Sequence, residues 1–224
     1  MKTRSSRLAS GKRQHSLTLV LVGDTHELHR ELEPPLGDIL IHVGDATMLS
    51  RSLRAIVDFN DWLGELSYAH RVFVPGNHDS FVQANPANRS LLTNATVLVN
   101  EGIEIEGLRI WGTPVTASGP GFCVKSAEGR RHLFGRIPDA TDVLISHAPP
   151  YGILDAGPGS QVHGGDRELL HAVVRVRPRL HCFGHIHGAE SLFITEQTVF
   201  ANAALLGADG SLLKKPIVLR MSRR

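Results

Sequence analysis

The stretch Leu180-His181-Cys182-Phe183-Gly184-His185-Ile186-His187 decides how this sequence can be interpreted. Its first four residues form an apolar run, which predicts a short buried strand that ends at Gly184. Side chains alternate in direction along a strand, so the turn that follows can aim His185 and His187 into one space. Such a pair carries little weight alone, because 13 of the 224 residues are histidine. Its meaning depends on whether other strands also end in metal-binding residue types.

Four other apolar runs end in the same way. They cover residues 16–22, 38–43, 71–74 and 142–146, and each predicts a buried strand. The carboxyl ends of parallel strands meet at one edge of a sheet, which is where open α/β folds bind ligands. We therefore expect one cluster of polar side chains at this edge, made of Asp24, His26, Asp45, Asn77, His78, His147, His185 and His187.

Helical patterns separate these strands. Apolar residues fall at helical spacing over residues 53–66 and 167–176, and shorter helices are expected near 87–92 and 125–134. The second half of the chain adds a hairpin that turns at Glu106-Gly107. Alternation of strands and helices, with hairpins, predicts an α/β protein in which two mixed sheets pack together with helices outside.

No internal repeat and no linker interrupts residues 16–224, so we expect a single domain there, preceded by a flexible basic tail at residues 1–15. The apolar run at residues 17–22 is too short for a signal peptide, and no run approaches the roughly 20 residues of a membrane span. Cys123 and Cys182 have no metal-binding spacing and predict free thiols in a reducing compartment, the cytoplasm. The net charge of +2 indicates no particular partner.

The cluster combines carboxylate, imidazole and amide ligands and contains no thiolate. That composition disfavours a structural zinc site and suits ions such as Mn²⁺, Fe²⁺ or Zn²⁺. Seven ligands are too many for one ion with an open position, but they fit two divalent ions that share a bridging carboxylate. Two such ions bind phosphoryl oxygens and activate a bridging water as a hydroxide nucleophile. The seven are Asp24, His26, Asp45, Asn77, His147, His185 and His187.

The eighth residue of the cluster, His78, need not bind metal. Beside Asp79 it can be oriented and kept protonated, and it can then stabilise or protonate the leaving oxygen. His42 and His181 lie inside strand runs and are expected in the core or directly behind the ligands. The role of His163 is left open between a site residue and a loop residue.

Taken one at a time, these polar residues also fit plainer roles. Asp24, Asp45 and Asn77 could be turn residues or helix caps, and His147 could be a loop histidine. Their occurrence at the ends of five separate strands in one chain favours the metal site.

These residues resemble the five ordered motifs of the calcineurin-like metallophosphoesterases. Segments such as Trp111-Gly112-Thr113-Pro114 are similar to the metallophosphoesterase-domain-containing branch of that family, whose animal members include the 239FB-type phosphodiesterases. The resemblance implies a four-layer α/β/β/α sandwich. The matching motifs are Asp24-x-His26, Gly44-Asp45, Gly76-Asn77-His78-Asp79, His147 and Gly184-His185-x-His187, which together span nearly the whole chain.

The resemblance also implies a role for each motif residue. His78 would be the general acid or oxyanion stabiliser, with Asp79 as its partner. The two ions would be Mn²⁺ by preference, with iron or zinc as alternatives. Because both histidines of the last motif are present, a competent two-metal site is expected. Asp24, His26 and His187 would hold the first ion, Asn77, His147 and His185 the second, and Asp45 would bridge them.

The chain lacks the arginine that follows the second motif in the protein phosphatases of this superfamily. Gly44-Asp45 is followed by Ala46-Thr47-Met48, and no arginine flanks Asn77-His78. A phosphate monoester carries about one more negative charge than a diester, and arginine usually matches that charge. We therefore expect a phosphodiesterase that acts on a cyclic nucleotide or a similar small diester. Arg30, Arg51 and Arg89 could still approach from loops, which keeps a phosphomonoesterase open.

Two further alternatives belong to other classes. A nuclease is disfavoured, because aromatic residues make up only 5% of the chain and no basic stripe is present. Some members of the superfamily are protein-binding scaffolds with degenerate metal sites, whereas this chain keeps every ligand. The irregular segments 113–136 and 152–165 are expected to wall the substrate, and the sequence does not determine the oligomeric state.

Overall fold

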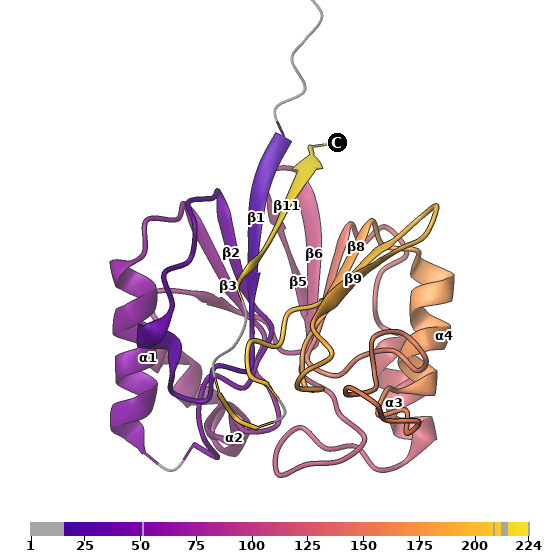
Figure 1. Cartoon of the computed structure of the whole chain (residues 1–224), viewed down its shortest axis with the longest axis horizontal. Coiled ribbons are helices and arrows are strands. Elements are labelled where there is room, and N and C mark those ends of the chain that lie inside the picture. The colour runs from indigo at the N-terminus through magenta and orange to yellow at the C-terminus, as the bar shows by residue number, and fades with distance from the viewer. Residues whose placement is uncertain (1–15, 51, 208, 212–214, 224) are drawn as a thin grey trace, which may run out of the picture.

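Two sheets lie face to face and helices cover their outer faces (Figure 1). The computed structural model describes residues 16–50, 52–207, 209–211 and 215–223. The strand order is β11-β1-β2-β3-β4 in the first sheet and β5-β6-β7-β8-β10-β9 in the second. The prediction of an α/β fold with a four-layer α/β/β/α arrangement of two mixed sheets is confirmed. The tail predicted at residues 1–15 lies outside the described residues.

The first sheet is parallel except for its last strand. Strands β1 to β4 pair in parallel, and β11 pairs antiparallel with β1. The helical elements α1, α2, η1 and η2 belong to this half. Their bounds, with those of the strands, are β1 (Ser16–Val22), η1 (His29–Glu31), β2 (Ile39–His42), α1 (Leu53–Glu65), β3 (His70–Phe73), α2 (Ser80–Ala84), η2 (Pro86–Leu91), β4 (Thr96–Val97) and β11 (Ile217–Ser222).

The second sheet has a parallel centre and an antiparallel strand at each end. β6, β7, β8 and β10 are parallel, whereas β5 and β9 run against their neighbours. Helices α3 and α4 cover its outer face (Figure 1). The bounds are β5 (Glu101–Ile105), β6 (Leu108–Thr113), α3 (Ala127–Phe134), β7 (Val143–Ser146), α4 (Arg167–Val176), β8 (Leu180–Phe183), β9 (Ser191–Ile194) and β10 (Val199–Asn202).

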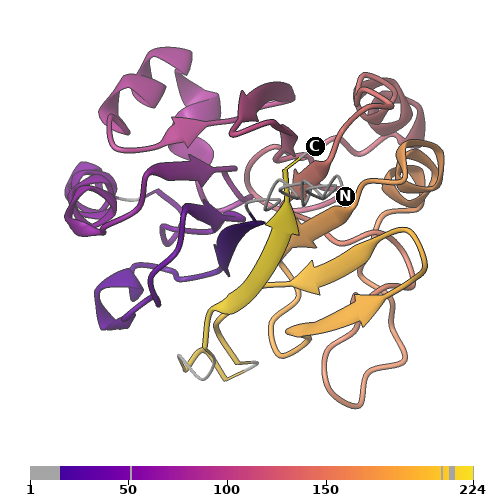
Figure 2. The same ribbon diagram turned by 90° about the horizontal axis from the view of Figure 1, so that it is seen from above.

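The strand sequences are continuously apolar because each sheet is buried on both faces. In β1, Leu19 and Leu21 pack into the core between the sheets, whereas Val20 and Val22 pack into the core under α1. In β8 the alternation is the same, with Cys182 between the sheets and Phe183 in the core under α4. Seen from above, the two halves of the sandwich lie side by side (Figure 2). The last strand, β11, lies in the first half, where it pairs with β1.

Most local predictions are confirmed, with small differences. The hairpin turns at Glu106 and Gly107, whose φ values of 53° and 79° suit a tight two-residue turn. The helix expected near residues 87–92 is the 3₁₀ helix η2, and α2 was not predicted. Cys123 and Cys182 are free, as expected, and the compartment stays a prediction. Among the described residues, none of the helices has the length and apolar character needed to span a membrane.

Candidate metal centre

The loops that follow β1, β2, β3, β7 and β8 converge at one edge of the sandwich. Their side chains form three overlapping groups, and within each group one ligand atom per residue lies within 4.8 Å of the others. The cluster predicted from the strand ends therefore exists, and it draws on both sheets. The groups are Asp24 with His26 and His187, His26 with Asp45 and His78, and Asp45 with His147 and His185.

The backbone at these strand ends is left-handed at several non-glycine residues. Asp24, His26, Asp45 and His185 have φ values of 50°, 42°, 52° and 69°. Such conformations cost free energy and persist only where surrounding contacts enforce them, which is common at functional sites. Two contacts that do so join the first two loops: the Asp24 N–H donates to the Gly44 carbonyl at 2.8 Å, and the His26 N–H to the Asp45 carbonyl at 3.0 Å.

Asp24, which follows β1 of the first sheet, contacts two residues that follow β8 of the second sheet. Its carboxylate oxygens accept the His185 backbone N–H at 2.9 and 3.1 Å. The Nε2 atom of His187 lies 3.3 Å from Asp24 Oδ1 and 3.3 Å from His26 Nε2. The hydrogen bond to Asp24 raises the pKa of His187, whereas burial lowers the pKa of His26. Three donors from opposite sheets thus surround one point.

A second set of donors surrounds His147, which is fully buried. Its Nδ1 donates to the Val43 carbonyl at 3.0 Å, so its Nε2 faces the cluster. That atom lies 3.0 Å from Asn77 Oδ1, 3.2 Å from His185 Nδ1 and 3.4 Å from Asp45 Oδ2. Asn77 thereby joins the site as expected.

Burial and neighbouring charges together set the pKa values of these groups. Burial lowers the pKa of His147, but the Asp45 and Asp24 carboxylates outweigh it and raise the value to about 9. Burial, with the nearby His147, lowers the pKa of His185 to about 4. Burial raises the pKa of Asp45, yet His147 and His26 outweigh it, and the net pKa lies below its usual range. Asp45 therefore remains a carboxylate at neutral pH.

This donor set fits divalent metal ions. Asp24 and Asp45 are buried carboxylates, and among the described residues their ion-pair partners are histidines rather than lysine or arginine. Buried carboxylates need a compensating positive charge. The imidazole nitrogens that face each other at 3.2–3.3 Å can all serve as ligands when a cation lies between them. Carboxylate, imidazole and amide groups, with no thiolate, suit a borderline-hard ion.

Asp79 does not act as the sequence suggested. Its buried carboxylate accepts four hydrogen bonds, from Gly76 N, Ala46 N, Thr47 N and Thr47 Oγ1, at 2.9–3.2 Å. These bonds use the capacity of both oxygens, so Asp79 joins the loops after β2 and β3 instead of orienting the His78 ring. Neighbours in a tight turn point in different directions, which spacing alone does not reveal. Burial and Asp45 raise the pKa of Asp79 to about 6.

His78 lies in the cluster, next to His26 and Asp45. Its backbone N–H donates to Asp45 Oδ1 at 2.8 Å, and its ring centroid lies 4.8 Å from that of His26. Its Nδ1 is buried and has no hydrogen-bond partner among the described residues. Its imidazole is thus close enough to the candidate ligands either to contact a bound substrate or to bind metal.

Two buried histidines support the ligand loops, as the sequence suggested for them. His42 accepts the Gly44 N–H at Nδ1 (3.3 Å) and therefore donates from Nε2 to Thr25 Oγ1 (3.2 Å). His181 Nε2 lies 2.8 Å from Ser146 Oγ, which donates to the Ala148 carbonyl. Burial lowers the pKa of each histidine to about 3, so both are neutral. Thr25 and Ser146 were not singled out from the sequence, since serine and threonine are common near strand ends.

Two irregular segments border the site. A Cβ atom added at Gly119 would lie 2.9 Å from the side chain of Asn77, so the backbone near residue 119 packs directly on that candidate ligand. The 152–165 loop lies against the last motif, because Asn202 Nδ2 donates to the carbonyls of both Leu154 and Ile186. Within that loop His163 Nδ1 bonds Asp155 Oδ1 at 2.7 Å, which gives His163 a structural partner.

Gly184 allows the two sheets to approach. A Cβ atom there would overlap Asp24 Oδ2. We expect Gly184→Ala to displace the Asp24 carboxylate and lower Mn²⁺ affinity at least about tenfold, as measured by calorimetry. Gly157→Ala is the control, because its Cβ would meet nothing closer than the His187 carbonyl at 3.6 Å. Equal affinity of the Gly184 variant and the native protein would contradict this account of Gly184.

The fold and the donor set together define a class, the metal-dependent hydrolases built on an α/β/β/α sandwich. A family model described as calcineurin-like phosphoesterase matches residues 17–189, and the chain belongs to this family. The family uses a dinuclear divalent metal centre and hydrolyses phosphoesters. The resemblance to the metallophosphoesterase-domain-containing branch is confirmed by the relatives described next.

Relatives match over most of the chain. Human metallophosphoesterase domain-containing protein 1 is 34% identical over 227 residues, covering 89% of this chain and 69% of the relative. The UPF0046 protein C25E10.12 of Caenorhabditis elegans is 33% identical over 217 residues, covering 86% and 76%. Among solved structures, TT1561 of Thermus thermophilus has a TM-score of 0.60 at 10% identity, over 94% of this chain and 100% of that one. This last likeness concerns the fold alone.

Proposed function

We propose that this metal-dependent phosphoesterase hydrolyses phosphodiesters, with a cyclic nucleotide or a similar small diester as its substrate and Mn²⁺ as its preferred ion. Two divalent ions held at the site would supply the positive charge that activates water and neutralises phosphoryl oxygens. In this scheme Asp24, His26 and His187 hold one ion. Asn77, His147 and His185 hold the other, and Asp45 is shared.

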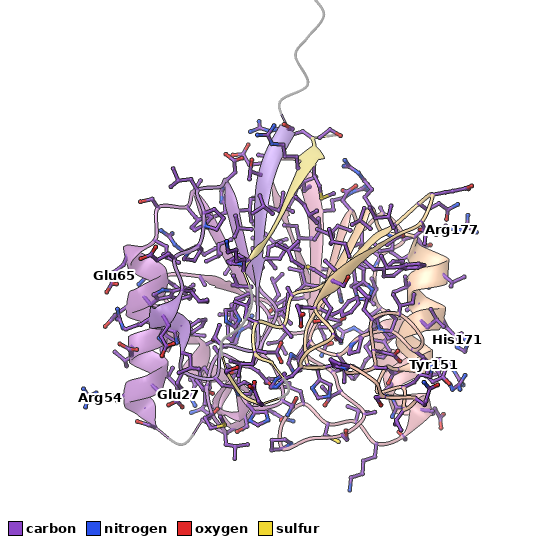
Figure 3. The ribbon with its side chains drawn as sticks, in the orientation of Figure 1. Glu27, Arg54, Glu65, Tyr151, His171 and Arg177 are labelled. Carbon is purple, nitrogen blue, oxygen red and sulfur yellow. The ribbon has the colours of Figure 1, made fainter. Side chains whose placement is uncertain are left out.

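The preference for a diester rests on the lack of an arginine in the motif loops and on the partners of the arginines that could approach from other loops. Arg30 bonds Asp58 and Glu65, and Glu65 lies at the opposite end of α1 from Arg54 (Figure 3). Arg89 bonds the Val97 carbonyl and Glu101. Two of the three arginines that could have favoured a monoester are therefore engaged elsewhere, and Arg51 lies outside the described residues.

The test is a Mn²⁺-supplemented assay with matched aryl esters. We expect bis(p-nitrophenyl) phosphate to be turned over faster than p-nitrophenyl phosphate, and 2′,3′- and 3′,5′-cyclic nucleotides faster than single-stranded DNA. Metal analysis of the purified protein should find two ions per chain. Faster hydrolysis of the monoester would favour the phosphomonoesterase alternative, and bound metal without hydrolysis of any ester would favour a scaffold.

His78 is proposed as the residue that stabilises or protonates the leaving oxygen. We expect His78→Gln to keep both metal ions while turnover of the aryl diester falls roughly 10²–10⁴-fold. The ratio of turnover to metal content separates the roles, because a ligand also loses metal. A fall in metal content that matches the fall in turnover would make His78 a ligand instead, which its place in the group with His26 and Asp45 permits.

A further inference from the structure

β9 is an edge strand on which every side chain is exposed. It ends the second sheet, and among the described strands it pairs with β10 alone; both are orange in Figure 2. The exposed fractions of its apolar residues are 42% for Leu192, 48% for Phe193 and 67% for Ile194. A free edge presents unpaired backbone N–H and C=O groups, so an apolar edge is a template for another strand.

The other three edges of the two sheets carry features that discourage such pairing. β4 has only two residues. β5 carries Glu101 and Glu104, and β11 carries the exposed Arg220. Short edges and charged side chains are the usual protection against edge-to-edge association. β9, with the sequence Ser-Leu-Phe-Ile, has neither a charge nor a proline.

The exposed apolar surface continues from β9 onto α4. The centroid of the Phe193 ring lies 6.0 Å from the centroid of the Phe200 ring. Phe200 in turn lines a groove of about 310 Å³, together with Val173 and Val174 of α4. Val174 is itself 61% exposed. The surface therefore combines a free strand edge with apolar side chains beside it.

We propose that β9 is the interface of a homodimer, in which two copies pair antiparallel through this strand about a two-fold axis. Alternation puts Leu192 and Ile194 on one face of β9 and Phe193 on the other. A matching partner strand must be uncharged and apolar on both faces. Among the described edge strands of this chain, β9 is the one with that composition. Its antiparallel pairing with itself is self-complementary, as a two-fold interface requires.

The surface is small for an interface between two copies. A four-residue strand with one helix face covers less than the roughly 800 Å² per partner of a standard interface, and interfaces at the low end of the size range are usually weak and transient. We therefore expect a weak dimer that forms at high protein concentration. The interface uses no residue of the candidate metal site, so it can be tested without metal or substrate. The outcome of that test does not depend on the proposed function.

Sedimentation over about 1 μM to 1 mM protein tests the dimer. We expect a monomer–dimer equilibrium for the native chain and at least about tenfold weaker association for Ile194→Lys, because each lysine then places an unpaired charge in the apolar interface. Val218→Lys is the matched control, since Val218 is 47% exposed on the edge strand β11. It should associate like the native chain. A native protein that stays monomeric throughout, or an Ile194→Lys variant that still dimerises normally, overturns the proposal.

Hydrogen exchange locates the interface directly. The amides of residues 191–194 should exchange more slowly at high than at low protein concentration, while those of β11 should not change. This measurement uses the native chain and does not depend on the folding of a variant. A dimer that leaves the exchange of residues 191–194 unchanged uses another surface and overturns the assignment of β9.

Discussion

Asp45→Asn should abolish hydrolysis, lowering turnover of an aryl phosphodiester in saturating Mn²⁺ by at least about 10³-fold. Asp45 belongs to two of the three groups, and its Oδ2 lies 3.4 Å from His147 Nε2 and 3.8 Å from His26 Nε2. Asparagine has the same shape, and its Oδ1 can still accept the His78 N–H. The substitution therefore removes charge and bridging ability rather than packing.

The measurements are turnover and metal content of the same preparation. We expect fewer than two ions per chain in Asp45→Asn, with the thermal unfolding temperature of the chelator-treated protein changed little. Asp61→Asn is the control, because Asp61 is an exposed carboxylate on α1. It should retain full activity. Normal turnover of Asp45→Asn with Mn²⁺ would exclude a two-metal site bridged by this residue.

Acid should destabilise the protein through its two buried neutral histidines. The pKa of His42 and of His181 is about 3 in the folded state and near 6.5 in the unfolded state. Between these values the unfolded chain binds more protons than the folded protein. The contribution of these two histidines to stability is therefore fully present above pH 6.5 and is lost as the pH falls toward 3. At pH 5 each histidine should cost roughly 2 kcal/mol of unfolding free energy, a large share of a typical 5–15 kcal/mol.

Urea unfolding at pH 8 and pH 5, in the presence of a chelator, measures this effect. His181→Gln can still donate to Ser146 Oγ but cannot take up a proton. The stability lost between the two pH values should therefore be about 2 kcal/mol smaller in this variant than in the native chain. His132→Gln, which changes an exposed side chain, should lose as much as the native chain. An unaltered pH dependence in His181→Gln would show that His181 is not the group that titrates.

The sheets and the clustering of the candidate ligands could be predicted because both depend on local patterns. Continuous apolar runs mark strands that are buried on both faces, and in a parallel sheet the residues after such strands share one edge. That reasoning placed Asp24, Asp45 and His147 together, although more than 100 residues separate the first from the last.

The rest depended on directions that sequence spacing does not encode. Asp79 follows His78 directly, yet its carboxylate turns back to the Gly76 and Thr47 amides. The pairing of His42 with Thr25 and of His181 with Ser146 required the register of the sheets. The exposure of β9 became evident only when its neighbours were placed around it.

The pairing of β1 with β11 has a consequence for biosynthesis. β1 is made first and reaches its antiparallel partner about 200 residues later, so the first sheet cannot be completed on a short nascent chain. Until β11 emerges from the ribosome, one edge of β1, with its leucines and valines, is open to pairing with other chains. Such long-range closure slows folding and exposes intermediates to aggregation. Production of this protein should therefore benefit more from slow synthesis and chaperone capacity than a helical protein of equal length would.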